Sequence, residues 1–130
     1  MNLDRLQQRI ADFQKAVKRL EEACQQEKND FIRDSVIQRF EFCYELAWKM
    51  LRLKLLQEDI DTRSPKATLQ AALELGLIED GNSWTELHRM RNLTTHTYDE
   101  SLAEEVYSFV CQVGLPLLEQ LAMRADTWKR

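Results

Sequence analysis

The sequence predicts an all-α protein, an antiparallel up-and-down four-helix bundle with one extra short helix. Only three Gly and two Pro occur in 130 residues, too few for the many turns of an all-β fold. Long segments carry apolar residues at every third or fourth position, which is the spacing of one helix face. A chain of this length supports one core, so we expect residues 1–130 to form a single domain.

The first helix is expected from about residue 3 to residue 26. It has one apolar stripe, which indicates a helix that packs on one side. Asn29 and Asp30 then supply a polar break and a possible cap for the next helix. The stripe consists of Leu3, Leu6, Ile10, Phe13, Val17, Leu20 and Cys24.

The second helix, expected at residues 33–57, is apolar on two sides. A helix of that kind is usually buried on more than one side. The pattern is compatible with a subunit interface and also with the central helix of a monomeric bundle. The first apolar set is Ile37, Phe40, Tyr44, Ala47, Leu51 and Leu55, and the second, partly opposite set is Phe42, Leu46, Leu53 and Leu56.

Helix signals continue along the rest of the chain. For the short third helix, Ser64 is the expected cap, Pro65 the first helical residue, and Gly76 the end. The tetrapeptide 83–86, Ser-Trp-Thr-Glu, reads as a capping box that opens a fourth helix.

The last long helix is expected from a cap at Asp99 or Ser101 to about Ala125, with a kink at Pro116. Its helical spacing predicts a core stripe along the whole segment. That stripe consists of Val106, Phe109, Val110, Val113, Leu117 and Leu121.

Chemically versatile residues gather in the octapeptide 91–98, Arg-Asn-Leu-Thr-Thr-His-Thr-Tyr. Arg91 has a permanent charge that suits phosphate, and His96 has the side chain suited to proton transfer near neutral pH. On an ideal helix these two residues lie about 140° apart, whereas Asn92 and His96 share a face. The threonines between them favour a looser helix end. A complete site therefore needs the Arg91 side chain to swing, or a symmetric partner that brings two motifs together.

The pattern Arg-x4-His-x-Tyr, with Asn92 directly after Arg91, resembles the motif of the HEPN superfamily. It is most similar to the HepT-type branch, which is encoded beside a minimal nucleotidyltransferase and is also called nucleotidyltransferase substrate-binding protein. Residues 31–51 resemble the long second helix of that family, through Ile-Gln-Arg-Phe-Glu-Phe at 37–42 and Glu-Leu-Ala-Trp-Lys at 45–49. The resemblance covers nearly the whole chain.

The resemblance implies a homodimer in which two Arg/His pairs line one cleft, and metal-independent RNA cleavage there. The 2'-hydroxyl attacks the adjacent phosphorus and leaves a 2',3'-cyclic phosphate, which requires RNA. His96 is then the general base or acid, and Arg91 stabilises charge on the non-bridging oxygens. Asn92 orients the imidazole or the phosphate.

For Tyr98 the resemblance implies a different role. In toxin–antitoxin pairs of this type, the minimal nucleotidyltransferase antitoxin transfers AMP to the motif tyrosine and silences the nuclease. A phosphate beside Arg91 would occupy the RNA phosphate site and repel the substrate. The alternative is that Tyr98 is an aromatic residue that covers the end of the bundle.

Two other functions remain open from the sequence. The protein could be a non-catalytic subunit that presents a nucleotide or another substrate to a partner nucleotidyltransferase. It could also be an interaction bundle in which Arg91 and His96 only bind a phosphate. All three functions use the same cleft.

The net charge of the protein restricts which nucleic acids it is expected to bind. A net charge of -4 and a pI near 5.3 argue against binding of duplex DNA through phosphate neutralisation. This net charge does not exclude a local basic cleft near the motif, where the nearest acids in the sequence are Glu86 and Asp99. Its basic members are His88, Arg89, Arg91 and His96.

Other expectations concern metals and location. His88, Asn92 and His96 share a helix face, but no Cys or acid completes a ligand set, so we expect neither metal nor cofactor. Glu41 and Glu45 are expected on a solvated or ion-paired face.

Three cysteines without framework spacing indicate free thiols and a cytoplasmic protein. The uncharged run 106–118 is shorter than a bilayer span, so no membrane association is expected.

Overall fold

The computed structural model describes residues 2–130, in which the regular structure is helical throughout. Met1 and the side chains of Asn2 and Leu3, the first member of the predicted stripe, lie outside what it describes. The helices are α1 (Asn2–Cys24), α2 (Asp30–Leu56), α3 (Pro65–Leu75), α4 (Gly81–Leu93), α5 (Glu100–Phe109) and α6 (Leu115–Asp126). A 3-10 turn, η1 (Thr94–His96), joins α4 to α5, and a π-helical turn, η2 (Val110–Gly114), joins α5 to α6.

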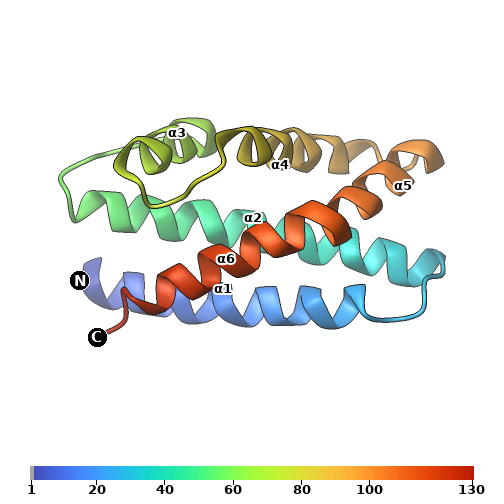
Figure 1. Ribbon diagram of the computed structural model, residues 1–130, viewed down its shortest axis with the longest axis horizontal. Helices are drawn as coiled ribbons and strands as arrows, with labels where there is room; N and C mark the ends of the chain where they lie inside the picture. Colours follow the sequence, from blue (N-terminus) through green and yellow to red (C-terminus); the bar gives the residue numbers. More distant parts are fainter. Residues whose placement is uncertain (1) are drawn as a thin grey trace.

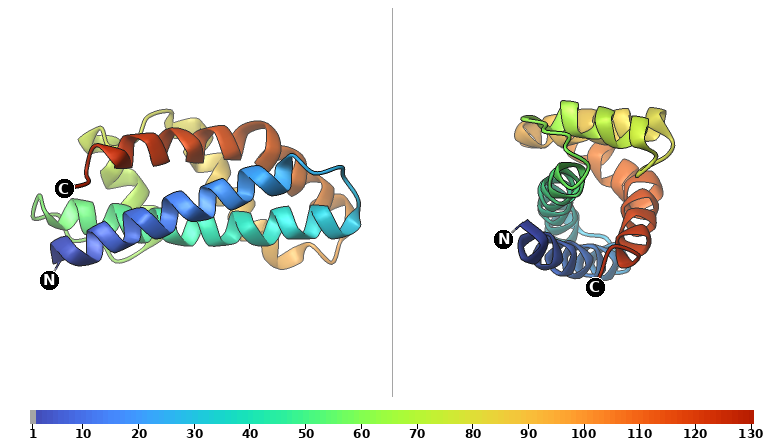
Figure 2. Two further views of the ribbon diagram at one scale, coloured as in Figure 1. Left: turned by 90° about the horizontal axis from the view of Figure 1, so that it is seen from below. Right: turned by 90° about the vertical axis from the view of Figure 1, so that its left-hand side faces the viewer.

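The segments α1, α2, α4 and α5–η2–α6 run alternately up and down, and α3 is the extra short helix (Figure 1). Helices α1 and α2 are antiparallel along the length of the molecule, α3 and α4 follow one another along one side of it, and α5–η2–α6 returns diagonally (Figure 1). Viewed along the bundle, the long helices surround one core (Figure 2). The predicted four-helix bundle with one extra short helix is confirmed.

The core follows the predicted stripes closely. On α1 the residues from Leu6 to Leu20 that were assigned to the stripe are all buried, and the whole first set of α2 is buried as well. Fully burying one such side chain stabilises the fold by about 1.5–3 kcal/mol. The second set of α2 is divided, because Leu53 is buried whereas Phe42 remains 53% exposed. Helix α2 is therefore the central helix of the bundle, and Phe42 lies on its outer side.

Two predicted helix starts are confirmed by their caps. The Asn29 side chain accepts a hydrogen bond from the Ile32 amide (2.8 Å), which satisfies one orphan donor of α2. Ser64 Oγ accepts from the Ala67 amide (3.1 Å) at the start of α3. Gly76 ends α3 with a left-handed backbone, φ 79°, as expected for a glycine after the last helical residue.

The predicted capping box at Ser83 is wrong. Helix α4 begins at Gly81, and its cap is Asp80, whose carboxylate accepts from the Ser83 amide (3.2 Å). Asp80 is itself left-handed, with φ 64°, a conformation that Asp tolerates better than most residues. Ser83 therefore donates its backbone amide to the Asp80 cap, and it lies inside the first turn of α4.

Pro116 has a different effect from a simple kink. Its ring has no N–H, so it cannot continue the regular ladder, and the helix accommodates it with a π turn directly upstream. In that turn the Leu115 amide donates to the Val110 carbonyl, five residues back. The extra residue rotates the inward face, so Gly114 is buried and Val113 is exposed. The inclusion of Val113 in the core stripe was therefore wrong, whereas the cap at Asp99 is confirmed.

By length and composition alone, the continuous helical stretch Glu100–Asp126 could cross a membrane. Several of its apolar side chains, such as Val106 and Leu118, are instead packed in the bundle core. A core helix meets the same criteria, so this property is weak evidence for a membrane span.

Candidate functional site

The motif lies where α4 gives way to η1 and the chain turns into α5. Three threonine hydroxyls donate to backbone carbonyls three residues back: Thr94 to Arg91 (2.7 Å), Thr95 to Asn92 (3.1 Å) and Thr97 to Thr94 (3.1 Å). Such bonds compete with the α-helical ladder, which accounts for the tighter 3-10 turn after Leu93. The α-helix ends at the threonines as expected, but the turn is tighter than an α-helix, so the predicted loosening is wrong.

Arg91 points toward α2 and is mostly buried, with 23% of its side chain exposed. Its Nη2 lies 3.4 Å from Glu45 Oε1, and its Nη1 lies 3.7 Å from Glu41 Oε2. The same Nη1 donates to Thr94 Oγ1 (3.1 Å). The two glutamates are one turn apart on α2, so the guanidinium is held between carboxylates. The expectation that Glu41 and Glu45 form an ion-paired face is confirmed.

A basic cleft, which the sequence left open, does not form around Arg89 and Arg91 in the part of the chain that the structure describes. Arg89 pairs with Glu86 at 3.1 Å and with Glu105 at 3.7 Å, and Arg91 is neutralised from α2. The acids that face Arg91 lie about fifty positions earlier in the sequence, and only helix packing brings them to the motif.

His96 and Tyr98 lie on the outer side of the same turn. Both are exposed, Tyr98 by 84%, and their ring centroids are 6.1 Å apart with the ring planes at 73°. Asn92 is also exposed. Within residues 2–130 no hydrogen bond or ion pair joins Arg91 to His96. The motif is thus divided between an inward arginine and three outward side chains.

An open groove runs beside Tyr98. It has a volume of about 540 Å³, which is within the range of small-molecule sites. Its walls come from the first half of α2 and from the turn before α5. The lining residues are Arg33, Asp34, Ile37, Gln38, Glu41, Thr97, Tyr98 and Glu100.

Arg33 fixes the geometry of this groove. It is buried, and its Nη1 donates to Glu100 (2.6 Å) and Glu104 (3.2 Å) at the start of α5. Its Nε donates to Asp34 (3.2 Å). Glu100 follows Tyr98 by two residues, so Arg33 fastens the end of the motif to α2. The sequence reasoning missed Arg33, although it lies in the segment that carries the family resemblance.

His88 belongs to a different environment. Its Nδ1 shares a hydrogen bond with the Tyr44 hydroxyl on α2. Burial lowers the pKa of His88, with a smaller effect from nearby Lys66, and burial raises the pKa of Tyr44 to about 12. His88 thus has a structural partner and does not join His96.

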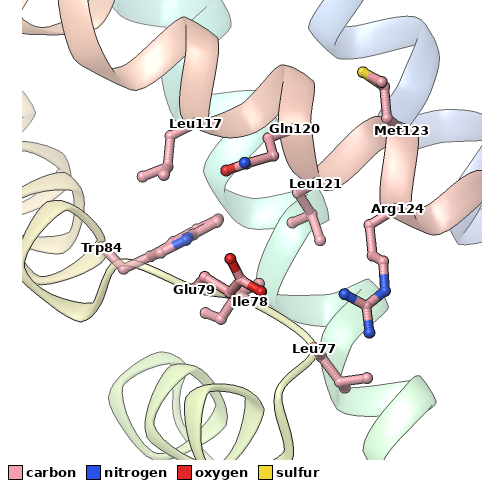
Figure 3. A pocket seen from close by; sticks show the side chains of 9 residues that line it. All are labelled: Leu77, Ile78, Glu79, Trp84, Leu117, Gln120, Leu121, Met123 and Arg124. Atoms are coloured by element: carbon pink, nitrogen blue, oxygen red, sulfur yellow. The ribbon is translucent and has the colours of Figure 1, made fainter.

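A second cavity lies away from the motif, between the loop before α4 and helix α6. It has a volume of about 300 Å³, with apolar walls that include Ile78 and Leu121 and polar groups from Glu79, Gln120 and Arg124 (Figure 3). These residues come from segments about forty positions apart, so no sequence motif marks the cavity.

Comparison with known proteins agrees with this architecture. A family model described as "Nucleotidyltransferase substrate binding protein like" matches residues 8–126. The chain belongs to this family. Its similarity to the HepT-like members, noted above on residues 31–51 and 91–98, is confirmed.

Relatives of this family are similar over most of their length. The chain is 40% identical over 104 residues to a "Probable ribonuclease HepT" of Haemophilus influenzae, covering 73% of this chain and 70% of that protein. A solved protein from Thermus thermophilus matches with a TM-score of 0.76 and 32% identity, covering 91% of this chain and 99% of that one.

HI0074 from Haemophilus influenzae is described as revealing the fold of a substrate binding domain of a nucleotidyltransferase. It matches with a TM-score of 0.67 and 30% identity, over 95% of this chain and 98% of that one.

Proposed function

We propose that this protein is a HepT-like ribonuclease, the cytoplasmic toxin of a pair whose antitoxin is a minimal nucleotidyltransferase. The observation that carries the proposal is the exposed imidazole of His96 on a threonine-fastened turn, next to Tyr98 and one turn beyond Arg91. Similarity to a probable ribonuclease HepT supports the same reaction class.

The reaction needs only the side chains of the motif. His96 takes the proton of the RNA 2'-hydroxyl, whose oxygen then attacks the adjacent phosphorus. The bond to the 5'-oxygen breaks, and this oxygen receives a proton from a second imidazole. The products are a 2',3'-cyclic phosphate and a 5'-hydroxyl. General acid–base catalysis of this kind contributes about 10² to 10⁴ in rate.

The acid and the base come from two copies in this scheme. One chain has one motif, and within it Arg91 faces α2 while His96 faces solvent. A homodimer that apposes two motifs supplies two imidazoles and two guanidiniums around one phosphate. Arg91 then stabilises charge on the non-bridging oxygens, and Asn92 orients the imidazole or the phosphate. The exposed Phe42 supports α2 as the helix for self-association in this proposal.

Tyr98 is the acceptor for AMP in this proposal. Its phenol is almost fully exposed and stands at the rim of the 540 Å³ groove. The phenol oxygen attacks the α-phosphorus of ATP and displaces pyrophosphate. The added phosphate introduces negative charge two residues from His96, which repels RNA.

The nuclease is tested with purified protein and a labelled single-stranded RNA. We expect cleavage that needs no divalent metal and yields 2',3'-cyclic phosphate ends. His96→Ala and Arg91→Ala are expected to lose at least about a hundredfold in rate, whereas His88→Gln is the matched control and retains activity. Cleavage that survives both motif substitutions would show that the site is elsewhere.

The modification is tested by intact mass after co-expression with the nucleotidyltransferase encoded beside the gene. We expect added mass in steps of one AMP on the wild type and none on Tyr98→Phe. Tyr107→Phe is the matched control, because Tyr107 is a partly buried phenol on α5. AMP on Tyr98→Phe would assign the acceptor to another residue.

A second function is favoured by a specific observation. The family description and HI0074 both refer to substrate binding for a nucleotidyltransferase, and Arg91 is already neutralised by two glutamates. A non-catalytic subunit that presents a nucleotide to that enzyme fits both facts. It predicts nucleotide binding that Tyr98→Phe leaves intact, together with no RNA cleavage at any protein concentration.

A further inference from the structure

Two of the three cysteines meet across the bundle. Cys24 is the last residue of α1 and Cys111 lies in the π turn η2, 87 positions later. The Cys111 thiol donates to Cys24, with 3.0 Å between the two sulfurs. Both residues are partly buried, whereas Cys43 is fully buried on α2. The pair is therefore within reach of small reagents and of each other.

We propose that Cys24 and Cys111 form a modification site, a dithiol that closes to an intramolecular disulfide when a peroxide or a low-molecular-weight disulfide oxidises it. A disulfide has an S–S length of about 2.05 Å, so the two sulfurs need to approach by about 1 Å.

The chemistry balances with one molecule of peroxide. The Cys111 sulfur attacks a peroxide oxygen, the O–O bond breaks, and a sulfenic acid and one water form. The Cys24 sulfur then attacks the Cys111 sulfur, the S–O bond breaks, and a second water leaves. Burial raises the pKa of the Cys24 thiol, and the thiolate is the reactive form. The same disulfide results if Cys24 is oxidised first and the Cys111 sulfur then attacks it.

A disulfide between Cys24 and Cys111 would reinforce contacts that already join the first two helices to the α5–η2 segment. Lys28, in the turn after α1, pairs with Glu104 of α5 and lies 5.0 Å above the ring of Tyr107. Arg33 pairs with Glu100 nearby. All these contacts hold the first two helices against the α5–η2 segment, and none of them is covalent. A disulfide would add a permanent link beside them, and it would restrain the unfolded chain as well.

The test uses the full chain, first reduced with a phosphine and then treated with hydrogen peroxide or diamide. We expect an intact mass lower by two hydrogens without dimer formation. Alkylation after unfolding then modifies one cysteine, Cys43, in place of three. Peptide mapping without reductant is expected to show residues 24 and 111 in one linked species, and the thermal midpoint is expected to rise by several degrees.

Variants distinguish this pair from adventitious oxidation. Cys24→Ser and Cys111→Ser are each expected to abolish the two-hydrogen loss, whereas Cys43→Ser leaves it intact. Three alkylatable thiols after oxidant, a bridge that includes Cys43, or a disulfide between two chains would each overturn the proposal. The wild-type measurement alone decides it, so a variant that folds poorly does not affect the outcome. The site does not depend on RNA cleavage.

Discussion

Arg91 Nη2 and Glu45 Oε1 lie 3.4 Å apart, although their residues are 46 positions apart on α4 and α2. Together with Glu41, this pairing places carboxylate oxygens where the phosphate oxygens of a substrate would meet the guanidinium. In the proposed function, a phosphate that binds at Arg91 competes with these contacts. The protein thus has an internal competitor for the anion that its motif is expected to bind.

Glu45→Gln is predicted to strengthen anion binding at Arg91. A partly exposed ion pair contributes about 0–1 kcal/mol, so its loss is expected to increase the affinity for a short single-stranded RNA about two- to fivefold. Fluorescence anisotropy at fixed ionic strength measures this. Glu58→Gln, beyond the end of α2, is the matched control with the same change in charge. Equal affinities for the two variants would contradict the competition.

Asp99→Ala is predicted to destabilise the end of the motif. The Asp99 carboxylate accepts from the amides of Ser101 (2.8 Å) and Leu102 (3.2 Å), and the loss of such a cap costs about 1 kcal/mol. Urea unfolding is expected to show this loss, with faster amide exchange at residues 100–102. Asp99→Asn keeps an acceptor and is expected to lose much less. Full stability of the alanine variant would show that the cap contributes nothing.

The stability of the protein is predicted to fall as the pH is lowered from 7 to 5. Burial and Lys66 lower the pKa of His88 from its ordinary value of 6.5, so the unfolded chain binds this proton more readily than the folded state. The stabilising contribution is complete above about pH 6.5 and is lost as the pH falls through the lowered folded pKa.

Chemical unfolding at several pH values measures this slope. His88→Gln keeps an acceptor for the Tyr44 hydroxyl, and this variant is expected to show a smaller loss of stability between pH 7 and pH 5. His96→Gln changes an exposed imidazole and is expected to leave the slope as in the wild type. An unchanged slope in His88→Gln would assign the acid sensitivity to other groups.

Gly76→Ala is predicted to cost about 1–2 kcal/mol through the backbone alone. Gly76 has φ 79°, and an added Cβ meets no atom within 4 Å, so the cost is that of a left-handed alanine. Gly81→Ala is the matched control, since its Cβ would make only ordinary contacts with Leu73 (3.6 Å) in a helical first turn. Thermal unfolding compares the two variants, and equal midpoints would contradict the assignment.

The helices and most of their inward faces follow from the sequence alone. Caps such as Asn29, Ser64 and Asp99 act on amides two or three residues away, so their effect is visible in a short segment. The apolar stripe of α1 has the helical period and needs no partner to be recognised. The motif residues were also found locally, because Arg91 to Tyr98 are contiguous.

What these residues face depends on how the helices pack. The partners of Arg91 lie on α2, and the contact of Cys24 with Cys111 spans 87 positions. No short sequence motif marks either contact, because residues that are far apart in the sequence come together only when the helices pack. The exposure of Val113 is likewise a result of the π turn before Pro116, which buries Gly114 in place of Val113. Local energetics thus specify the helices, and the way the helices pack specifies the charge and chemistry of the site.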